Sequence, residues 1–396
     1  MSYGTSLINI FFIPILLLSG SGSDQNDPPI RIGATMSQSG SYSTQGIAAK
    51  NGYLLCEQDI NSKGGVLNRE IEFIIYDDQS NSQIAIDLYE KMITEEGVDA
   101  IMGPYGSTLT EAVAPVTEHH RMVHISPLAA TSSIWEQGRQ YLFMILPPAE
   151  LFLAGLIEMA YENELKSIAI IQENQLFPKA AGFGAADLAR KKGMDVNIIY
   201  TYNSGRTDFS GFLKTVKYAE IDVLAMSASA LDDFITITKQ MKELEVNVKM
   251  FGTSGAVTPF QEALGEDAEY IYGLSAWEPG LPNPGIDLFV ESYRNRFQVE
   301  PSFHAAGAYA ACQIFIEAIR RAESLDSDLL REELLNMEIQ TILSNYAVDE
   351  RGYQIANSGL FIQWQDGEKV IVWPAELAQD KPRFPTPKWD QRLIKD

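Results

Sequence analysis

The chain has 396 residues, of which 45% are apolar and 21% are charged, as in ordinary soluble globular proteins. This length exceeds what one hydrophobic core normally serves, so we expect two lobes. With 53 Asp and Glu against 30 Lys and Arg, the net charge of −23 argues against the basic face that a nucleic-acid backbone requires. We therefore expect no nucleic-acid partner.

The N-terminal segment differs from the rest. Residues 7–18, "LINIFFIPILLL", form an apolar run that is followed by the small and polar stretch "SGSGSDQNDPP". The run is too short to span a bilayer and suits the core of a signal peptide, although no Lys or Arg precedes it. We expect residues 1–28 to be a targeting segment and the mature protein to be periplasmic or otherwise extracytoplasmic; a disordered apolar start is the alternative. Residues 18–21 resemble a lipoprotein cleavage box, but Ser21 replaces the lipid-bearing Cys, which argues against lipid anchoring.

From residue 29 short apolar strands alternate with helical patterns. In the first half we expect strands at 30–34, 71–76, 100–102 and 122–125 and helices at 45–62, 82–95 and 108–119. After two prolines the pattern restarts, with helices at 151–163, 179–192, 209–219 and 232–243 and strands at 167–172, 195–200, 223–226, 248–251 and 270–274. This alternation predicts an α/β fold with two Rossmann-like lobes whose central sheets are parallel.

The C-terminal part continues neither lobe. Helices at 286–297 and 305–322 precede an expected hairpin of residues 345–348 and 359–364, with its turn at 349–352. We expect these segments to cross between the lobes. The resulting assignment is 29–146 and 276–344 to lobe 1, 147–275 and 345–373 to lobe 2, and 374–396 to a Pro-rich tail that is an extended strap or disordered.

Two loops of small residues follow consecutive strands of lobe 1. Gly106, Ser107 and Thr108 open a predicted helix, and residues 129–133, "AATSS", follow the next strand. Small residues let a ligand approach the backbone, and hydroxyl and N–H groups at a helix start suit an anion. Open α/β sheets bind ligands at the carboxyl ends of their strands, so the two loops predict a ligand site.

Other polar groups point to structure rather than chemistry. His119, His120 and His124 straddle a helix end and a strand, which favours a solvated helix C-terminus over a metal site. Asp77 and Asp78 are adjacent on a strand and are interpreted as cap residues of the next helix. No GxSxG, P-loop or GxGxxG motif occurs, and we expect neither a metal nor a cofactor.

Cys56 and Cys312 both fall in predicted helices with apolar neighbours. They can pair in an exported protein, but two small buried hydrophobic side chains are the favoured interpretation. No Cys/His spacing indicates a structural metal.

Seven segments, in order, resemble the periplasmic solute-binding proteins of the branched-chain amino acid and amide type over about residues 29–374. They are "IRIGATMSQSGSYSTQG", "DINSKGGVLNREIEFIIYDDQSN", "DAIMGPYGST…ISPLAATS", "IAIIQENQLF", "TDFSGFLKTVKYAEIDVL", "MFGTSGAV" and "LFIQWQDGEKVIVWP". The resemblance implies a type I periplasmic binding protein, in which two lobes joined by three crossovers close on a small solute. It also implies delivery of that solute to an ABC importer, with a membrane permease as partner, and we expect a monomer.

The resemblance also carries over binding roles. It implies that Ser107 binds a ligand carboxylate, that Thr131 does so from the second loop, and that the carbonyl of Ala129 faces an ammonium; an insertion at Leu128 leaves this register open by one residue. Ser254 stands where branched-chain binders carry a glutamate for the ammonium. The expected ligand-binding residues are Ser107, Ala129, Ala130, Thr131, Phe177, Ser229, Ser254, Gln45, Tyr42 and Trp277.

The expected function is a receptor for a small carboxylate, which is an amino acid, a 2-oxo acid or an aromatic acid. Because a buried ammonium needs a carboxylate partner, Ser254 favours a solute without an ammonium unless Asp232, Asp233 or Glu278 replaces the missing acid. The alternative is a ligand sensor on the same fold. An enzyme is disfavoured because no set of nucleophile and base stands out.

Overall fold

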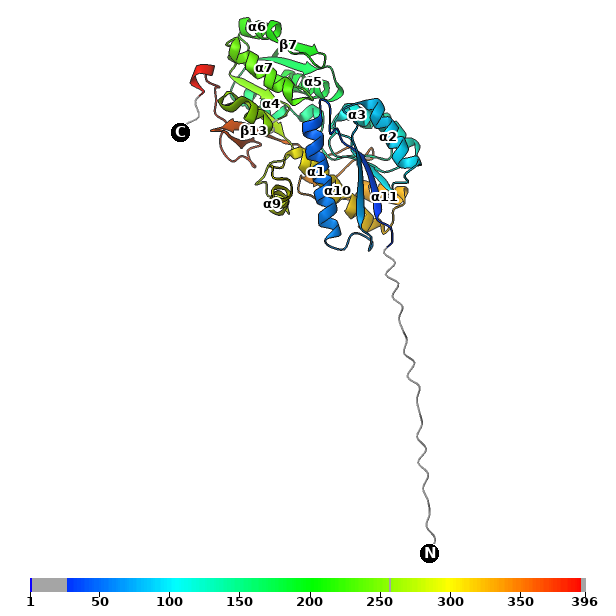
Figure 1. The fold of residues 1–396 in the computed structure, drawn as a ribbon. Coiled ribbons are helices and arrows are strands. Elements are labelled where there is room, and N and C mark those ends of the chain that lie inside the picture. Colours follow the sequence, from blue (N-terminus) through cyan, green and yellow to red (C-terminus); the bar gives the residue numbers. More distant parts are fainter. Residues whose placement is uncertain (2–26, 256–257, 393–396) are drawn as a thin grey trace.

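The computed structural model describes Met1 and residues 27–255 and 258–392. The apolar run at 7–18 lies outside the described residues. The described chain forms two lobes (Figure 1), one holding the blue and cyan part of the sequence and the other holding the green part. Among the described helices, none is both long and apolar enough to cross a membrane.

Lobe 1 is built on a five-stranded sheet in which all pairs are parallel. In spatial order its strands are β2 (Ile71–Tyr76), β1 (Ile30–Thr35), β3 (Ala100–Met102), β4 (His124–Ser126) and β5 (Leu142–Met144). Its helices are α1 (Ser43–Asn61), α2 (Ser82–Thr94), α3 (Ser107–His119), α9 (Ile286–Phe297), α10 (Phe303–Ala322) and α11 (Ser327–Asn336). The sequence pattern missed β5 and α11 but located the others.

Lobe 2 is built on a seven-stranded sheet. In spatial order its strands are β14 (Glu368–Trp373), β13 (Leu360–Gln365), β10 (Tyr272–Ser275), β9 (Met250–Thr253), β8 (Val223–Ser227), β6 (Ser167–Glu173) and β7 (Asp195–Tyr202). Its helices are α4 (Ala154–Glu162), α5 (Leu176–Lys191), α6 (Ser210–Tyr218), α7 (Leu231–Glu243) and α8 (Thr258–Leu264).

The sheet of lobe 2 is parallel except at one edge. There β13 pairs antiparallel with both β10 and β14. A tight turn at Asp366 and Gly367, both with positive φ, joins β13 to β14, and Asp-Gly is a preferred pair for such hairpins. The expected parallel sheets are thus confirmed with an antiparallel edge added.

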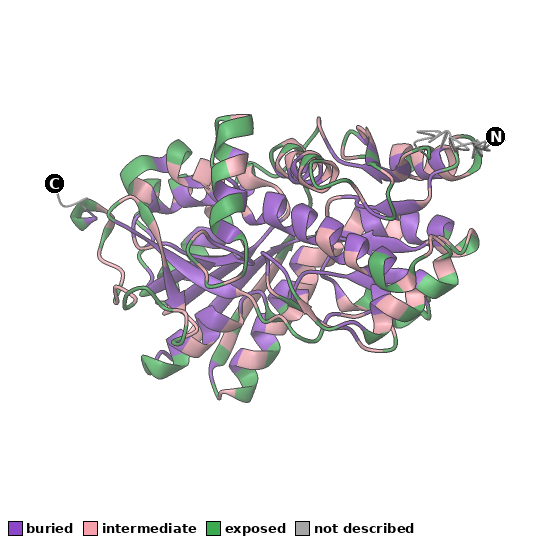
Figure 2. Cartoon of the chain, turned by 90° about the horizontal axis from the view of Figure 1, so that it is seen from below, coloured by how far each residue is buried: buried purple, intermediate pink, exposed green. Residues whose placement is uncertain are grey.

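The chain crosses between the lobes in three places, as expected. The crossings follow β5, β10 and the short strand β12 (Asn345–Tyr346). Strands and the inner faces of helices are buried in both lobes, while the outer helix faces are exposed (Figure 2). This pattern is that of sheets covered on both faces.

The expected hairpin of residues 345–348 and 359–364 is wrong. Instead β12 pairs with β11 (Ile339–Gln340), and the chain then folds back on lobe 1, where the N–H of Met144 donates to the carbonyl of Gly352 at 2.9 Å. Asp349 holds this turn by accepting from the N–H groups of Arg351 and Tyr353 at 3.0 and 3.2 Å. The turn therefore pairs Val348 with Gln354 in an antiparallel bridge instead of leading to residues 359–364, and residues 345–355 lie with lobe 1 rather than lobe 2.

The described part of the tail runs as a strap along lobe 2. The N–H of Gln379 donates to the carbonyl of Ile371 in β14 at 2.8 Å, and that of Thr386 donates to the carbonyl of Lys249 at 2.9 Å. A short 3₁₀ helix, η4 (Trp389–Gln391), follows. Its Trp389 indole N–H donates to the carbonyl of Val246 at 2.9 Å.

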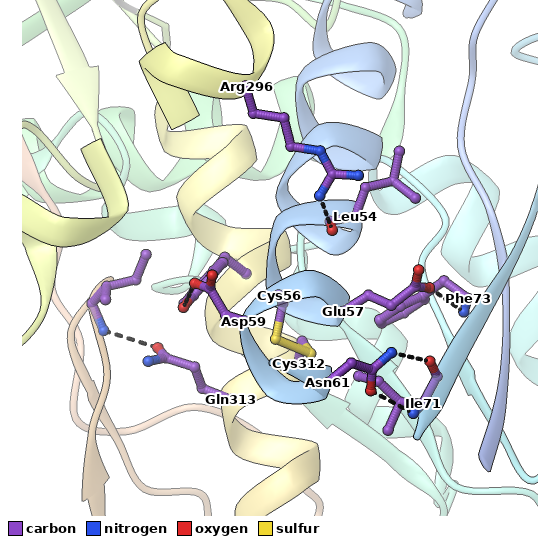
Figure 3. The surroundings of a disulfide bond; sticks show 12 residues. Leu54, Cys56, Glu57, Asp59, Asn61, Ile71, Phe73, Arg296, Cys312 and Gln313 are labelled. Atoms are coloured by element: carbon purple, nitrogen blue, oxygen red, sulfur yellow. Dashed lines mark hydrogen bonds between the residues drawn. A yellow bond between two sulfur atoms is a disulfide. The ribbon is translucent and has the colours of Figure 1, made fainter. Parts of the chain in front are cut away.

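Cys56 of α1 and Cys312 of α10 form a disulfide (Figure 3), so the favoured interpretation of two unpaired hydrophobic side chains is wrong. The two cysteines are 256 residues apart in the sequence and almost fully buried. Gly52 of α1 packs on the backbone of Ala305 of α10, one turn before Cys56. The disulfide therefore joins two closely packed helices of lobe 1.

Candidate functional site

The carboxyl ends of strands from both lobes border one cavity. Its empty volume is about 750 Å³, part of which is open to solvent. From lobe 1 it is lined by Tyr42, Gln45, Tyr105, Gly106, Ser107, Thr108, Leu109, Leu128, Ala130, Leu146, Phe303 and His304. The remaining lining residues are Phe152, Phe177, Ala228, Ser229, Leu231, Phe234, Ser254 and Gly255.

The start of α3 forms one polar edge of this cavity. Gly106 precedes the helix with φ 82, a conformation that side chains disfavour, and no side chain caps the helix. The first N–H groups of a helix have no partner within it, and they favour an anion. Residues 106–109 line the cavity, so this helix start is available to a solute.

Ser107 ties the two small-residue loops together. Its Oγ accepts from the N–H groups of Ala130 at 3.1 Å and Thr131 at 3.3 Å. A hydroxyl also has one hydrogen to donate, so Ser107 can hold the second loop and still donate to a solute.

The polar groups of lobe 2 lie opposite. The Gln45 amide of lobe 1 donates to the carbonyl of Ser229 at 3.3 Å, which bridges the two lobes. Ser254 faces the same space, but its hydroxyl is held by the backbone of Ala228, with contacts of 3.3 and 3.4 Å. Ser254 therefore offers the cavity a neutral group already engaged with its own lobe.

Much of the remaining wall is aromatic. Phe177 packs edge-on against Phe152, with ring centroids 5.0 Å apart. In lobe 1, Tyr105 makes similar contacts with Tyr42 and His304, both at 5.5 Å. Rings packed in this way form a stiff apolar surface against which a flat or branched solute can lie.

None of the cavity-lining residues named above has a side chain that is ionised at neutral pH. The titratable residues among them include His304, and burial lowers the pKa of its imidazole to about 3, so it is neutral. Burial also raises the pKa of Tyr42 to about 12, with the nearby Glu173 and Asp233 adding to this effect and the Ser229 hydroxyl opposing it. An anion in this cavity would therefore be held by hydrogen bonds and helix dipole rather than by a positive side chain.

The three acids that could pair with an ammonium in place of the missing glutamate do not line the cavity. Asp232 is exposed, and Asp233 accepts from the hydroxyl of Tyr202 at 2.7 Å. Glu278 pairs with Lys369 at 2.6 Å. None of the three contributes to the wall that a solute would touch.

The structure brings most of the predicted site residues together. Those that line the cavity are Tyr42, Gln45, Ser107, Ala130, Phe177, Ser229 and Ser254. Ala129 is fully buried beside it, and Trp277 is buried in a crossing segment against Phe289, 5.6 Å between ring centroids. Thr131 lines a separate groove, and its buried hydroxyl has no hydrogen-bond partner.

Sequence reasoning missed several lining residues. Tyr105 directly precedes Gly106 of the predicted first loop, so its position after a strand was itself a signal. Phe152 and Phe234 lie near helix starts that follow strand ends. Phe303 and His304 begin α10, far along the chain, and no local pattern marked them as part of the site.

The histidine and aspartate interpretations need correction. His124 is fully buried, contacts the Thr117 hydroxyl at 3.2 Å, and is not part of a solvated helix end; burial lowers its pKa to about 4. Asp78 is also buried and accepts from the hydroxyls of Thr35 and Ser37 at 2.8 and 2.5 Å, so it braces the end of β1. The cap of α2 is Asn81, which accepts from two N–H groups of the helix. Among the described residues no group of three or more His, Cys, Asp or Glu is placed to hold a metal.

Comparisons with known proteins agree with this architecture. A Leu/Ile/Val-binding protein homolog 7 from Brucella melitensis is 23% identical over 390 residues, covering 93% of this chain and 97% of that protein. The branched-chain amino acid transporter substrate-binding protein LivJ of Streptococcus pneumoniae, solved with isoleucine, has a TM-score of 0.79 at 21% identity, covering 87% of this chain and 100% of that one. An ABC transporter solute-binding protein of R. palustris, solved with benzoate, has a TM-score of 0.77 at 17% identity, covering 87% and 95%.

A family model spans nearly all of the two lobes. It is described as periplasmic binding protein and matches residues 29–369. This range includes the sheet of lobe 1, the sheet of lobe 2 up to the start of β14, and every residue that lines the cavity. The chain therefore belongs to the periplasmic binding protein family.

Proposed function

We propose that this protein is an extracytoplasmic receptor for a small carboxylate that has an apolar or aromatic body and no α-ammonium group, and that it delivers this solute to an ABC importer. The observation that carries the proposal is the cavity wall itself. A helix start and Ser107 offer donors for an anion, while none of the side chains named as lining the cavity is ionised to pair with a buried ammonium. The aromatic wall around Phe177 suits the body of such a solute.

The same wall argues against a simple amino acid. An ammonium buried without a carboxylate partner is strongly disfavoured. The side chain of Ser254 is a neutral hydroxyl and cannot act as that partner. Asp232, Asp233 and Glu278, which were considered as alternative partners for an ammonium, do not line the cavity. Aromatic acids and branched 2-oxo acids satisfy these constraints. The benzoate complex of the R. palustris protein provides a precedent on this fold.

Isothermal titration with matched pairs tests the solute class. Leucine is compared with its 2-oxo analogue, phenylalanine with its 2-oxo analogue, and benzoate is tested alone. We expect each acid without the ammonium to bind at least tenfold more tightly than its amino acid, about 1.4 kcal/mol. Tenfold tighter binding of leucine would overturn the proposal. A thermal-shift screen of amino acids, amides, 2-oxo acids and aromatic acids identifies other solutes, because binding to the folded state raises Tm.

Export is the second part of the proposal. The disulfide between Cys56 and Cys312 suits an oxidising compartment, as does the apolar run at 7–18. We expect the mature protein in the periplasmic or secreted fraction, with a processed N-terminus visible by mass spectrometry. Cytosolic retention of the full chain would contradict this part. Permease genes beside the coding gene would separate an importer subunit from a sensor on the same fold.

A further inference from the structure

Two hydrogen bonds cross between the lobes beside the cavity. The Thr108 hydroxyl of lobe 1 donates to Oε1 of Gln175 in lobe 2 at 3.0 Å. The Gln45 amide of lobe 1 donates to the carbonyl of Ser229 in lobe 2 at 3.3 Å. Gln45 and Thr108 lie at the starts of α1 and α3, so the two bonds hold two different elements of lobe 1 against lobe 2.

Both bonds lead to one carboxylate. The first hydrogen bond continues through Gln175. The Gln175 amide donates to the Ser204 hydroxyl at 3.1 Å, and that hydroxyl donates to Oε1 of Glu173. The second contact reaches the same side chain because the N–H of Ser229 donates to Oε2 of Glu173 at 2.9 Å. Every donor in the two chains points toward Glu173.

Glu173 is well placed for this role. It lies at the carboxyl end of β6, where the sheet of lobe 2 faces lobe 1, and only 2% of its surface is exposed. A carboxylate accepts hydrogen bonds and donates none, so it sets the direction of both chains. Bonds to a charged acceptor are also stronger than neutral ones. Glu173 is not among the residues that line the cavity.

We propose that Glu173 is a positioning residue for lobe closure, the buried acceptor on which both interlobe hydrogen-bond chains end. It holds Gln175 and Ser229 in the orientations that receive lobe 1. This inference deepens the proposed function, because solute retention depends on how long the lobes stay closed. It does not depend on which solute is bound.

Glu173→Gln keeps the size of the side chain and removes its charge. Its amide can accept from only one of the two donors without placing an N–H against the other, so one chain weakens. Glu269→Gln is the matched control. Glu269 is also a buried carboxylate of lobe 2, 1% exposed, and accepts from the N–H groups of Asp366 and Gly367 at 2.9 and 2.6 Å within the β13–β14 turn.

The first measurement needs no solute. Small-angle scattering of the free proteins should show a larger radius of gyration for Glu173→Gln than for wild type, with Glu269→Gln unchanged. If Glu173→Gln and wild type scatter alike, the inference is wrong. This result is independent of whether the proposed solutes bind.

The second measurement uses the tightest-binding acid from the titrations. We expect Glu173→Gln to dissociate about 10-fold faster, with an association rate near that of wild type, while Glu269→Gln changes neither. A double-mutant cycle with Thr108→Val should show coupling between the two sites. Purely additive effects, or equal dissociation rates in the two Glu→Gln variants, would overturn the inference. Failure of wild type to bind any acid would instead contradict the proposed function.

Discussion

The contact of α1 with α10 leaves no space for a side chain at Gly52. A Cβ added there would lie 2.2 Å from the carbonyl oxygen of Ala305 and 3.0 Å from its carbonyl carbon. Ordinary contacts begin at 3.4 Å, so the helices must separate by about 1.2 Å at this level. The obstacle is backbone, which cannot rotate away as a flexible side chain can. The disulfide one turn further along also resists the separation.

Gly52→Ala should therefore destabilise lobe 1, although alanine favours a helix by up to about 1 kcal/mol relative to glycine. Forcing one extra carbon into a packed interface typically costs about 1–3 kcal/mol, and here the obstruction is severe. We expect a net loss of about 2 kcal/mol and a fall in Tm of about 4 °C or more. Solute binding should weaken too, because the first turn of α1 carries Gln45 into the cavity.

Gly211→Ala is the matched control for this substitution. Gly211 lies in α6, is exposed, and has no atom within 4 Å of the position of an added Cβ. The same substitution there should leave Tm unchanged or raise it by a few degrees, since only helix propensity is affected. Thermal unfolding followed by circular dichroism compares the two variants. A Gly52→Ala protein as stable as wild type would refute the reasoning about the helix contact.

Three further changes test other features. Ser107→Ala should weaken solute binding by about 1.5–3 kcal/mol, measured by titration. Thr131→Ala should bind nearly as tightly as wild type, because the hydroxyl of Thr131 lies outside the cavity. The reverse order of affinities would place the anion site at Thr131. Replacing Cys56 and Cys312 together by Ala should lower the free energy of unfolding by about 2–5 kcal/mol in denaturant titrations, and an unchanged midpoint would contradict a structural role. Burial raises the pKa of Asp233 to about 6, above the unfolded value, so the fold gains stability as the pH falls from 7 toward 4. Asp233→Asn should be more stable than wild type by about 1–3 kcal/mol at pH 7 and by much less at pH 4, whereas an equal difference at both values would argue against this titration.

Part of the site followed from one rule about parallel sheets. Strand ends place backbone, and so the loop of Ser107 and the loop of residues 129–133 were expected to meet, whereas Ser229 and Ser254 were expected from the family resemblance alone. The direction of a side chain within such a loop depends on local turns, which is why Thr131 lines a neighbouring groove and its hydroxyl is buried away from the cavity. His304 arrives from a helix nearly two hundred residues after the first loop, and only the packing of α10 on α1 brings it there.

The dependence of contacts on tertiary packing also explains where the predicted fold was wrong. The Asp366–Gly367 turn was a readable hairpin signal, but β14 after it was not assigned to a strand. The turn at 349–352 was expected to lead to residues 359–364, whereas it pairs Val348 with Gln354, and the carbonyl of Gly352 accepts from the N–H of Met144 in β5, which is distant in sequence. Pairing of Cys56 with Cys312 likewise depends on tertiary contact. Local patterns identify the elements; which of them meet is decided by the core.

The neutral wall of the cavity has a consequence for the speed of capture. The chain carries a net charge of −23, and no cation named in the wall offsets it where a solute enters. An anionic solute therefore approaches against a repulsive electrostatic field. Dissolved salt screens this field, and the screening length is about 8–10 Å at physiological ionic strength. Raising the ionic strength should speed association of an anion and leave its escape rate nearly constant. Most receptors for charged ligands show the opposite trend, since their fixed counter-charges attract the ligand and are screened by the same salt.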